Sequence, residues 1–344
     1  MQHIITRHPS IANQHVSWGK IEEGENPTDE FLTKISDYFQ KRIEKESLTR
    51  NSGCWDPIVG GHGSIIEDLK NKNFENLRST FRKICSSNLS VGISGGDNCF
   101  KARMNSEDER QKYAVIQYDR LVTLMEFAGI IEMFWQEIYD SNKLFNYHLE
   151  QKPEFHLQKI AERYNFDISA PKDAGGQYGL KTDYGIYSER DMWALEVAMR
   201  VSDCFKNKNI KICEIGGGFG HLAYYLNKMG FTNYTIVDLP TISVSQMYFL
   251  GMNLGEEKVN FISPEDFDGK YDLVLNVDSM PEMGRDTAKK YCDIMKNNSN
   301  YFMSVNIENI SHRGYTVNQL CEMDKVARNI FWTRFGYVVE EWVR

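Results

Sequence analysis

The feature that most constrains the fold of this 344-residue chain is an apolar run that ends in a cluster of glycines. Residues 210–215 have the composition of a short strand, and an amphipathic stretch follows at 222–229. Between them lie Gly216, Gly217, Gly218 and Gly220. Glycine suits a sharp turn between a strand and a helix, because the backbone turns there with no Cβ in the way of a ligand. The segment therefore predicts a strand, a ligand-binding turn and a helix.

Short apolar runs alternate with amphipathic stretches from residue 209 onward. The predicted strands cover residues 210–215, 234–237, 259–262, 271–277, 301–307 and 337–343. The predicted helices cover residues 222–229, 242–251, 282–297 and 317–331. Strands that alternate with helices form βαβ units, so we predict an α/β fold with a mostly parallel sheet flanked by helices.

The first half of the chain shows helical spacing of apolar residues, interrupted by loops. Predicted helices cover residues 29–45, 65–70, 74–85, 107–149 (as one helix or two), 155–164 and 188–205. Predicted loops cover residues 51–64, 87–98 and 169–187, the last of them long and ordered. We therefore divide the chain into a mainly helical region, residues 1–187, which we expect to supply a substrate lid or a dimer contact, and a second domain, residues 188–344, whose first helix is capped by Ser188.

Charge and composition argue against several classes of protein. A net charge of −8 disfavours broad contact with nucleic acid or an anionic membrane. The most apolar stretch, residues 121–138, contains Glu126, Glu132 and Glu137, so it predicts a buried helix and no stable membrane insertion. The seven cysteines include no Cys-x-x-Cys pair, which indicates reduced thiols. Residues 1–10 contain no apolar run, so we expect no signal peptide and a cytoplasmic protein.

The glycine turn differs from that of dinucleotide-binding proteins. A Gly-x-Gly-x-x-Gly site that begins at Gly216 would need glycine where this chain has His221. The chain instead has Glu214-x-Gly216-x-Gly218-x-Gly220, which resembles motif I of class I S-adenosylmethionine-dependent methyltransferases. The resemblance implies a Rossmann-like core with a sheet of the seven-stranded type. It also implies that the turn wraps the amino-acid part of S-adenosylmethionine, with the cofactor site formed by Glu214, Gly216, Gly217, Gly218 and Gly220.

Three later segments extend this resemblance in the expected order. Asp238 ends the second predicted strand and precedes Leu239; a carboxylate there can accept both ribose hydroxyls, so both residues are expected at the cofactor. The family pattern implies that Asp266, with Glu265 as the alternative, faces the adenine amine. Residues 271–278 resemble the motif IV strand, which implies that its end, with Asn276, lies beside the sulfonium.

Residues 276–283, with the sequence Asn-Val-Asp-Ser-Met-Pro-Glu-Met, resemble a segment of the sugar O-methyltransferases of bacterial polysaccharide and capsule biosynthesis. The layout of the chain is similar as well, with a helical first half and a loop containing Tyr184 just before the core. The resemblance covers about residues 184–307. It implies methyl transfer to a sugar hydroxyl on a nucleotide-linked sugar or a polysaccharide. The aromatic rings of Tyr178, Tyr184 and Tyr187, in the loop before the core, could stack on sugar or cofactor.

A sugar hydroxyl is a poor nucleophile, so a general base or a metal ion should assist its attack. The candidate catalytic residues are Asp278 at the end of the fourth strand, Glu282, and His312 after the fifth strand, whose ordinary pKa suits a base. His221 and Glu308 are further candidates. Asp278, Glu282 and Glu308 could hold a divalent ion, but their spacing is no metal signature, so we predict no metal.

The expected partner is a small-molecule sugar acceptor, nucleotide-activated or polymeric. A diphosphate would need basic residues, for which the chain offers Lys101, Arg103, Lys181, Arg190, Arg285 and Arg313. A long helix within residues 113–138 could pair in a homodimer. A methyltransferase for another small acceptor and a non-catalytic scaffold stay open as alternatives. The retained acids and glycines argue against the scaffold, and His221 argues against a nucleotide-dependent oxidoreductase.

Overall fold

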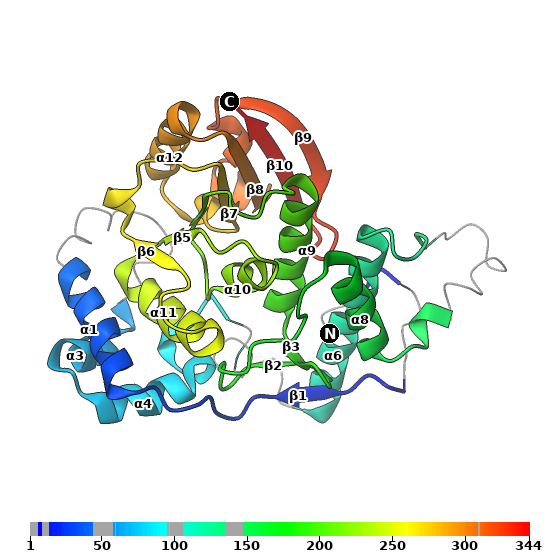
Figure 1. The fold of residues 1–344 in the computed structure, drawn as a ribbon, viewed down its shortest axis with the longest axis horizontal. Coiled ribbons are helices and arrows are strands. Elements are labelled where there is room, and N and C mark those ends of the chain that lie inside the picture. The colour runs from blue at the N-terminus through cyan, green and yellow to red at the C-terminus, as the bar shows by residue number, and fades with distance from the viewer. Residues whose placement is uncertain are drawn as a thin grey trace.

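The computed structural model describes residues 6–8, 14–43, 58, 60–94, 96, 106–134, 147–308 and 310–344, apart from the side chain of His312. These residues form a helical first part and an α/β second part (Figure 1). One continuous cluster of buried apolar residues contains side chains of both parts. None of the helices in these ranges has the length and apolar content that crossing a membrane requires.

A seven-stranded sheet forms the centre of the second part, in the order β6-β5-β4-β7-β8-β10-β9. Its strands are β4 (Ile212–Ile215), β5 (Tyr234–Val237), β6 (Asn260–Ile262), β7 (Leu273–Val277), β8 (Tyr301–Ile307), β9 (Asp324–Ile330) and β10 (Tyr337–Val343). Neighbours from β6 to β8 pair in parallel, whereas β10 is antiparallel to both β8 and β9. The prediction of a mostly parallel sheet is confirmed, and the carboxyl ends of its parallel strands meet at one edge.

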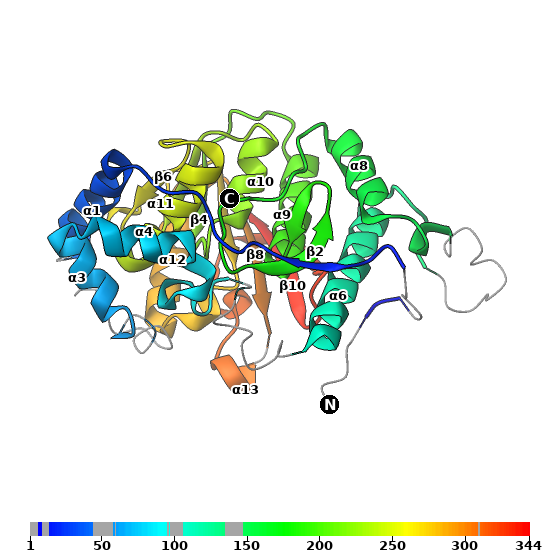
Figure 2. The same ribbon diagram turned by 90° about the horizontal axis from the view of Figure 1, so that it is seen from below.

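Helices cover both faces of this sheet (Figures 1 and 2). They are α9 (Glu189–Cys204), α10 (His221–Lys228), α11 (Pro240–Leu254) and α12 (Arg285–Asn298), with the short turns η5 (Pro264–Asp266), η6 (Met280–Glu282) and α13 (Ile310–Arg313). Ile212 and Ile236 pack in the core under α9, α10 and α11, whereas their chain neighbours Cys213 and Val237 pack in the core under α12. Side chains of successive strand residues point to opposite faces, which is why these strands are apolar throughout.

The helices of the first part lie in two groups at opposite ends of the molecule (Figures 1 and 2). They are α1 (Asp29–Ile43), α3 (Gly63–Asn71), α4 (Phe74–Arg82), α6 (Glu107–Phe127) and α8 (Pro153–Tyr164), with the turns η2 (Ile84–Ser86) and η3 (Asn88–Ser90). Helix α1 packs on α11 at one end, and α6 packs on α8 and α9 at the other. The helical character of this part is confirmed, while the domain boundary between residues 187 and 188 stays a prediction.

The segment 169–187, which we predicted as a loop, contains two strands. Strands β2 (Tyr178–Thr182) and β3 (Gly185–Tyr187) form a hairpin, and β1 (Trp18–Lys20) pairs with β2 to complete a small antiparallel sheet. The prediction failed because glycine and charged residues weaken the strand signal in this segment. Pairing with a strand near the other end of the region compensates for that weak local signal.

The predicted helix at residues 317–331 is also wrong. This segment holds the 3₁₀ turn η7 (Val317–Gln319) and the edge strand β9. All residues of β9 except Ala327 are exposed, so the strand lacks the alternation of buried and exposed residues that marks a half-buried strand. Its hydrogen bonds to β10, which no local pattern encodes, decide its conformation.

The apolar stripe of α6, which we considered for a homodimer, is used inside the chain. Tyr118, Leu121 and Leu124 of this helix are fully buried in the shared core. Residues 135–138 of the proposed dimer helix lie outside the described residues. A homodimer therefore stays a prediction, without this stripe as its basis.

Candidate functional site

The glycine turn lies where the strand order of the sheet reverses. β4 pairs with β5 on one side and with β7 on the other, so the chain leaves β4 toward one half of the sheet and later returns to its other side. In open α/β sheets, such a point leaves a crevice outside the carboxyl ends of the strands, where ligands bind. The topology alone therefore predicts a ligand site in this crevice.

The backbone of the turn requires glycine. Gly216, Gly218 and Gly220 have φ values of +72°, +55° and +105°, a range that side chains with a Cβ rarely adopt. A Cβ on Gly216 would lie 2.1 Å from the Oγ of Ser279, so this position has no room for one. In contrast, apart from Gly218 and its two chain neighbours, no atom of the described residues lies within 4 Å of the Cβ position of Gly218, which faces open space. The turn thus presents bare backbone toward the crevice.

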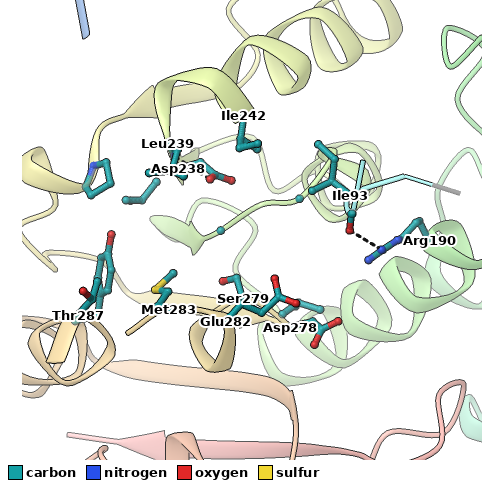
Figure 3. Close-up of a pocket in the computed structure, with 17 residues that line it drawn as sticks. Ile93, Arg190, Asp238, Leu239, Ile242, Asp278, Ser279, Glu282, Met283 and Thr287 are labelled. Atoms are coloured by element: carbon teal, nitrogen blue, oxygen red, sulfur yellow. Dashed lines mark hydrogen bonds between the residues drawn. The ribbon is translucent and has the colours of Figure 1, made fainter. Parts of the chain in front are cut away.

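A cavity of about 860 Å³, which includes space open to solvent, extends from this turn (Figure 3). Its two long walls come from β5 and α11 and from β7 and η6, and carry Asp238, Leu239, Ile242, Asp278, Ser279 and Glu282. Met283 and Thr287 lie at one end, and Arg190 and Ile93 lie at the other. The cavity is therefore built by the Rossmann-like part, with one contribution from the first part of the chain.

A second cavity of about 440 Å³ meets the first one at Arg190. Five residues line both cavities, namely Ile93, Arg190, Gly216, Gly218 and Val277. The second cavity is further lined by Trp193, Glu214 and His221. The glycine turn thus borders both the larger and the smaller cavity.

Asp238 is held at the rim of the main cavity by neutral donors. Its Oδ2 accepts a hydrogen bond of 2.7 Å from Nε2 of Gln246, and its Oδ1 accepts one of 2.8 Å from the backbone N–H of Leu239. The same Nε2 of Gln246 donates to the carbonyl oxygen of Gly218 at 2.9 Å. Gln246, which sequence reasoning missed, therefore fixes the carboxylate relative to the glycine turn.

Asp278 is held on the opposite wall by a cation and a phenol. Its Oδ2 accepts a hydrogen bond of 2.6 Å from Nη1 of Arg334, and its Oδ1 accepts one of 2.8 Å from the hydroxyl of Tyr337. The guanidinium of Arg334 lies 4.0 Å from the ring centre of Trp193 and 3.7 Å from that of Tyr337. Asp278 itself has a φ of +59°, which for a non-glycine residue marks a constrained position at a site.

The other acids proposed for catalysis are each paired with an arginine. Glu282 lines the main cavity and accepts a hydrogen bond of 3.1 Å from Nη2 of Arg313. Glu308 pairs with Arg328, outside the lining of both cavities. Across the described ranges, no group of three or more His, Cys, Asp or Glu side chains is placed to hold a metal ion. His312 belongs to α13, but its side chain lies outside the described residues.

Two ionisable groups of the second cavity are deeply buried. Burial raises the pKa of Glu214 to about 8, against an opposing effect of the hydrogen bond of 2.8 Å that the Tyr234 hydroxyl donates to its Oε2. Burial also lowers the pKa of His221, whose Nε2 lies 3.4 Å from Oε1 of Gln177. Burial therefore favours the neutral form of both the His221 imidazole and the Glu214 carboxyl group.

Four residues expected at the cofactor lie outside the lining of both cavities. Gly220 of the turn faces α11 instead, where an added Cβ would lie 3.1 Å from Leu250. The Asn276 side chain is buried, donating to the Ile215 carbonyl at 2.8 Å and accepting from the Asn306 amide at 2.8 Å. Asp266 is exposed in η5, where its neighbour Pro264 lines the main cavity instead. Tyr184 lies at the turn of the β2–β3 hairpin, outside the lining of both cavities. Their roles toward a cofactor stay predictions.

A substrate lid or a dimer contact was expected from residues 1–187, but the sequence did not predict which residues of this part line the cavity. Gly92 and Ile93 follow η3 and line the main cavity. Nη2 of Arg190 donates to the carbonyl oxygen of Gly92 at 3.0 Å, as the dashed line in Figure 3 shows. Arg190 was named only as one of several basic residues, and a loop residue such as Ile93 carries no motif that could have identified it.

No family model matches the chain, and no curated protein matches its sequence. Solved methyltransferase structures align with less than half of it. Magnesium protoporphyrin IX methyltransferase from Synechocystis PCC 6803, with bound S-adenosylmethionine, is 15% identical, with a TM-score of 0.37 over 45% of this chain and 80% of its own. The 1,6-didemethyltoxoflavin-N1-methyltransferase of Burkholderia thailandensis is 15% identical, with a TM-score of 0.36 over 44% of this chain and 78% of its own. A glycopeptide N-methyltransferase is 12% identical, with a TM-score of 0.36 over 43% of this chain and 88% of its own.

These identities and TM-scores are too low to support an assignment, so the fold is assigned from the topology of the sheet. The parallel strands β6-β5-β4-β7-β8, the antiparallel β10 inserted between β8 and β9, and the glycine turn after β4 define a Rossmann-like core of the methyltransferase type. The helical region precedes this core in the chain. The predicted fold class is therefore confirmed.

Proposed function

We propose that the protein is an S-adenosylmethionine-dependent methyltransferase that methylates a sugar hydroxyl. The observation that carries the proposal is the glycine turn at the topological switch point, with Gly218 open to a cavity whose rim holds Asp238. A nucleoside needs a carboxylate for its ribose, and an amino-acid group needs bare backbone that it can approach closely. Both requirements are met within one crevice.

The residues present fit the parts of this cofactor. The carboxylate of Asp238 accepts the ribose hydroxyls, while Leu239, Ile242 and Pro264 offer apolar contacts to the adenine. The second cavity, bounded by the glycine turn and Arg190, takes the amino-acid part. When bound, S-adenosylmethionine supplies an electrophilic methyl group on a sulfonium.

The wall at the end of β7 supports the catalytic part of the proposal. Asp278 and Glu282 both line the main cavity, and the contacts of Arg334 and Tyr337 fix the orientation of the Asp278 carboxylate. We assign to Asp278 the role of accepting the proton from the acceptor hydroxyl as the methyl group is transferred, with Glu282 as the alternative. The sugar as acceptor rests on the resemblance of residues 276–283, and its attachment to a nucleotide or a polymer is left open.

Calorimetric titration tests the cofactor, and an acceptor panel tests the substrate. S-Adenosylmethionine and S-adenosylhomocysteine should bind the wild type with micromolar Kd, and Asp238→Ala should abolish this binding. The control is Asp37→Ala, which removes an exposed carboxylate that pairs with Lys72 on the surface. Methyl transfer to nucleotide sugars or oligosaccharides, but not to phenols or amines, supports the sugar assignment, and the reverse selectivity contradicts it. Absence of binding to folded protein contradicts the methyltransferase assignment as a whole.

A further inference from the structure

Arg190 lies at the junction of the two cavities and uses only part of its guanidinium. It is the second residue of α9, and its Nη2 donates to the carbonyl oxygen of Gly92 at 3.0 Å. Its guanidinium lies 5.0 Å from the ring centre of Trp193. Its Nε is buried and has no hydrogen-bond partner. A buried donor without an acceptor costs about 1–3 kcal/mol, so this edge of the guanidinium is suited to an incoming acceptor.

The surroundings indicate that this acceptor is an anion. The two other arginines that stack on Trp193 are each paired with a carboxylate, Arg120 with Glu189 at 3.5 Å and Arg334 with Asp278 at 2.6 Å. Within the described part of the chain, no carboxylate lies in salt-bridge range of Arg190. The cavity that Arg190 lines therefore contains a cation whose charge has no partner there.

A second donor in the same cavity lacks an acceptor. The indole Nε1 of Trp193 is buried without a hydrogen-bond partner, and the residue is only 7% exposed. Trp193 and Arg190 both line the second cavity, beside Gly216 and Gly217 of the turn. Two unpartnered donors from one helix, one of them cationic, match the two oxygens of a carboxylate.

The carbonyl that Arg190 already holds belongs to the first part of the chain. We call residues 87–94 the lid segment; it contains η3 and ends at Ile93 and Ser94. Its first half packs on the core through Leu89, which is 2% exposed. The carbonyl oxygen of Leu89 accepts a hydrogen bond of 3.4 Å from the hydroxyl of Ser245 in α11. Its second half places Gly92 and Ile93 against the cavity, where the bond to Arg190 holds Gly92.

We infer that Arg190 binds the carboxylate of the cofactor's amino-acid part through its unpartnered edge, and thereby fixes the lid segment over the site. This inference rests on the proposed function. Because Nε and Nη2 belong to one rigid, planar guanidinium, a carboxylate bound at Nε orients the group whose Nη2 holds Gly92. Cofactor and lid segment then stabilise each other, and the coupling acts equally in both directions.

Hydrogen exchange with a pair of ligands tests the coupling. S-Adenosylhomocysteine carries the carboxylate, whereas 5′-methylthioadenosine has the same nucleoside and thioether but no amino-acid part. We expect S-adenosylhomocysteine to slow exchange in residues 87–94 about tenfold, as a bond to a charged group would. We expect 5′-methylthioadenosine to occupy the site without this protection. Both ligands should protect the backbone around Asp238.

Variants test the role of Arg190 itself against that of the residues around it. Arg190→Met should weaken binding of S-adenosylhomocysteine about 10- to 100-fold and remove the protection of the lid segment, while the Kd of 5′-methylthioadenosine changes less than about threefold. Arg190→Lys keeps the positive charge but loses the planar guanidinium. This variant should recover part of the affinity for S-adenosylhomocysteine but not the protection of the lid segment. The control is Arg120→Lys, which alters another arginine over Trp193 that lines neither cavity.

The outcomes distinguish this inference from the proposed function. Equal protection by both ligands, or unchanged affinity of Arg190→Met for S-adenosylhomocysteine, overturns the role of Arg190 and leaves the methyltransferase proposal intact. Absence of binding by both ligands to the folded wild type overturns the two together. Thermal unfolding of each variant, compared with the wild type, shows whether a loss of binding reflects loss of the fold.

Discussion

Two aspartates lie on opposite walls of the main cavity, and they are held in different ways. Asp238, at the end of β5, receives hydrogen bonds from two neutral donors, the Gln246 amide and the Leu239 N–H. Asp278, at the end of β7, receives one from the cationic Arg334 and one from the Tyr337 hydroxyl. Both carboxylates are thus fixed in orientation, and the second contacts the counter-charge of Arg334 directly.

In the proposed function, the different donors of the two aspartates fit two roles, cofactor binding for Asp238 and methyl transfer for Asp278. The Gln246 amide and the Leu239 N–H orient the Asp238 carboxylate, as the proposed acceptance of hydrogen bonds from ribose hydroxyls would require. The guanidinium of Arg334 balances the charge of Asp278 in a cavity that, in the proposed function, also takes up a cationic cofactor. A general base that is fixed in this way can accept the proton of an acceptor hydroxyl only at a defined position. The first wall would then bind the cofactor and the second would serve the acceptor.

The largest expected effect is on turnover, at the second wall. Asp278→Asn should lower the methyl-transfer rate about 1,000-fold, because loss of a positioned general base costs roughly 10²- to 10⁴-fold. The Kd of S-adenosylmethionine, measured by calorimetry, should change less than about threefold, because the variant keeps the shape of the wall. Unchanged turnover would remove Asp278 from the chemistry, and Glu282→Gln would then be the variant to measure.

The next effect is on cofactor affinity, at the first wall. Asp238→Asn should raise the Kd of S-adenosylhomocysteine about 30- to 100-fold, because an amide replaces a carboxylate that accepts charge-assisted hydrogen bonds. Gln246→Leu, which removes the donor to Asp238 and to Gly218, should have a smaller effect of about 5- to 10-fold. If Asp238→Asn and Asp278→Asn weaken the binding of S-adenosylhomocysteine to the same extent, the two walls do not have the separate roles proposed for them.

The glycine turn between the walls offers a matched pair of substitutions. Gly216→Ala and Gly218→Ala both place a Cβ at a positive φ, which costs about 1 kcal/mol each. Only at Gly216 would this Cβ collide with Ser279, so its variant should be less stable than Gly218→Ala by about 2 kcal/mol in urea unfolding. Gly218→Ala should instead lose more cofactor affinity, because its methyl group points into open space of the cavity. Equal stabilities would contradict the close contact with Ser279.

The smallest expected effect is a pH dependence of stability, from Glu214. Its pKa of about 8 in the folded protein lies above the ordinary value of 4.5, because the carboxyl is buried. Between these values the unfolded chain loses its proton first, so the free energy of unfolding should fall as pH rises. The slope from this group is at most about 1.4 kcal/mol per pH unit.

Glu214→Gln removes the titrating group and keeps an acceptor for the Tyr234 hydroxyl. The variant should therefore show a flatter profile than the wild type in urea unfolding at pH 5, 6, 7 and 8. A profile as steep as that of the wild type would assign the slope to other groups. If Glu214 also meets the cationic amine of the cofactor, binding at pH 7 should release protons, which calorimetry in buffers of different ionisation enthalpy detects.

The regular part of the fold was predictable because neighbouring residues encode it. The parallel strands and the helices between them follow from apolar periodicity, and the turn after β4 follows from the steric need for glycine. The predictions failed where partners far along the chain decide the conformation. β9 is exposed on both faces and forms only against β10, and the hairpin of β2 and β3 forms against β1.

The sequence by itself determined the parallel strands from β4 to β8 and their order along the chain, the glycine turn, and the two acids at strand ends, Asp238 and Asp278. These depend on local geometry, since a parallel sheet brings the carboxyl ends of its strands to one edge. Only the tertiary structure decided which groups surround those acids. Arg334 reaches Asp278 from the loop before β10, and Gly92 reaches Arg190 from the helical region. Contacts of this kind depend on how distant segments pack, which no local pattern of residues records.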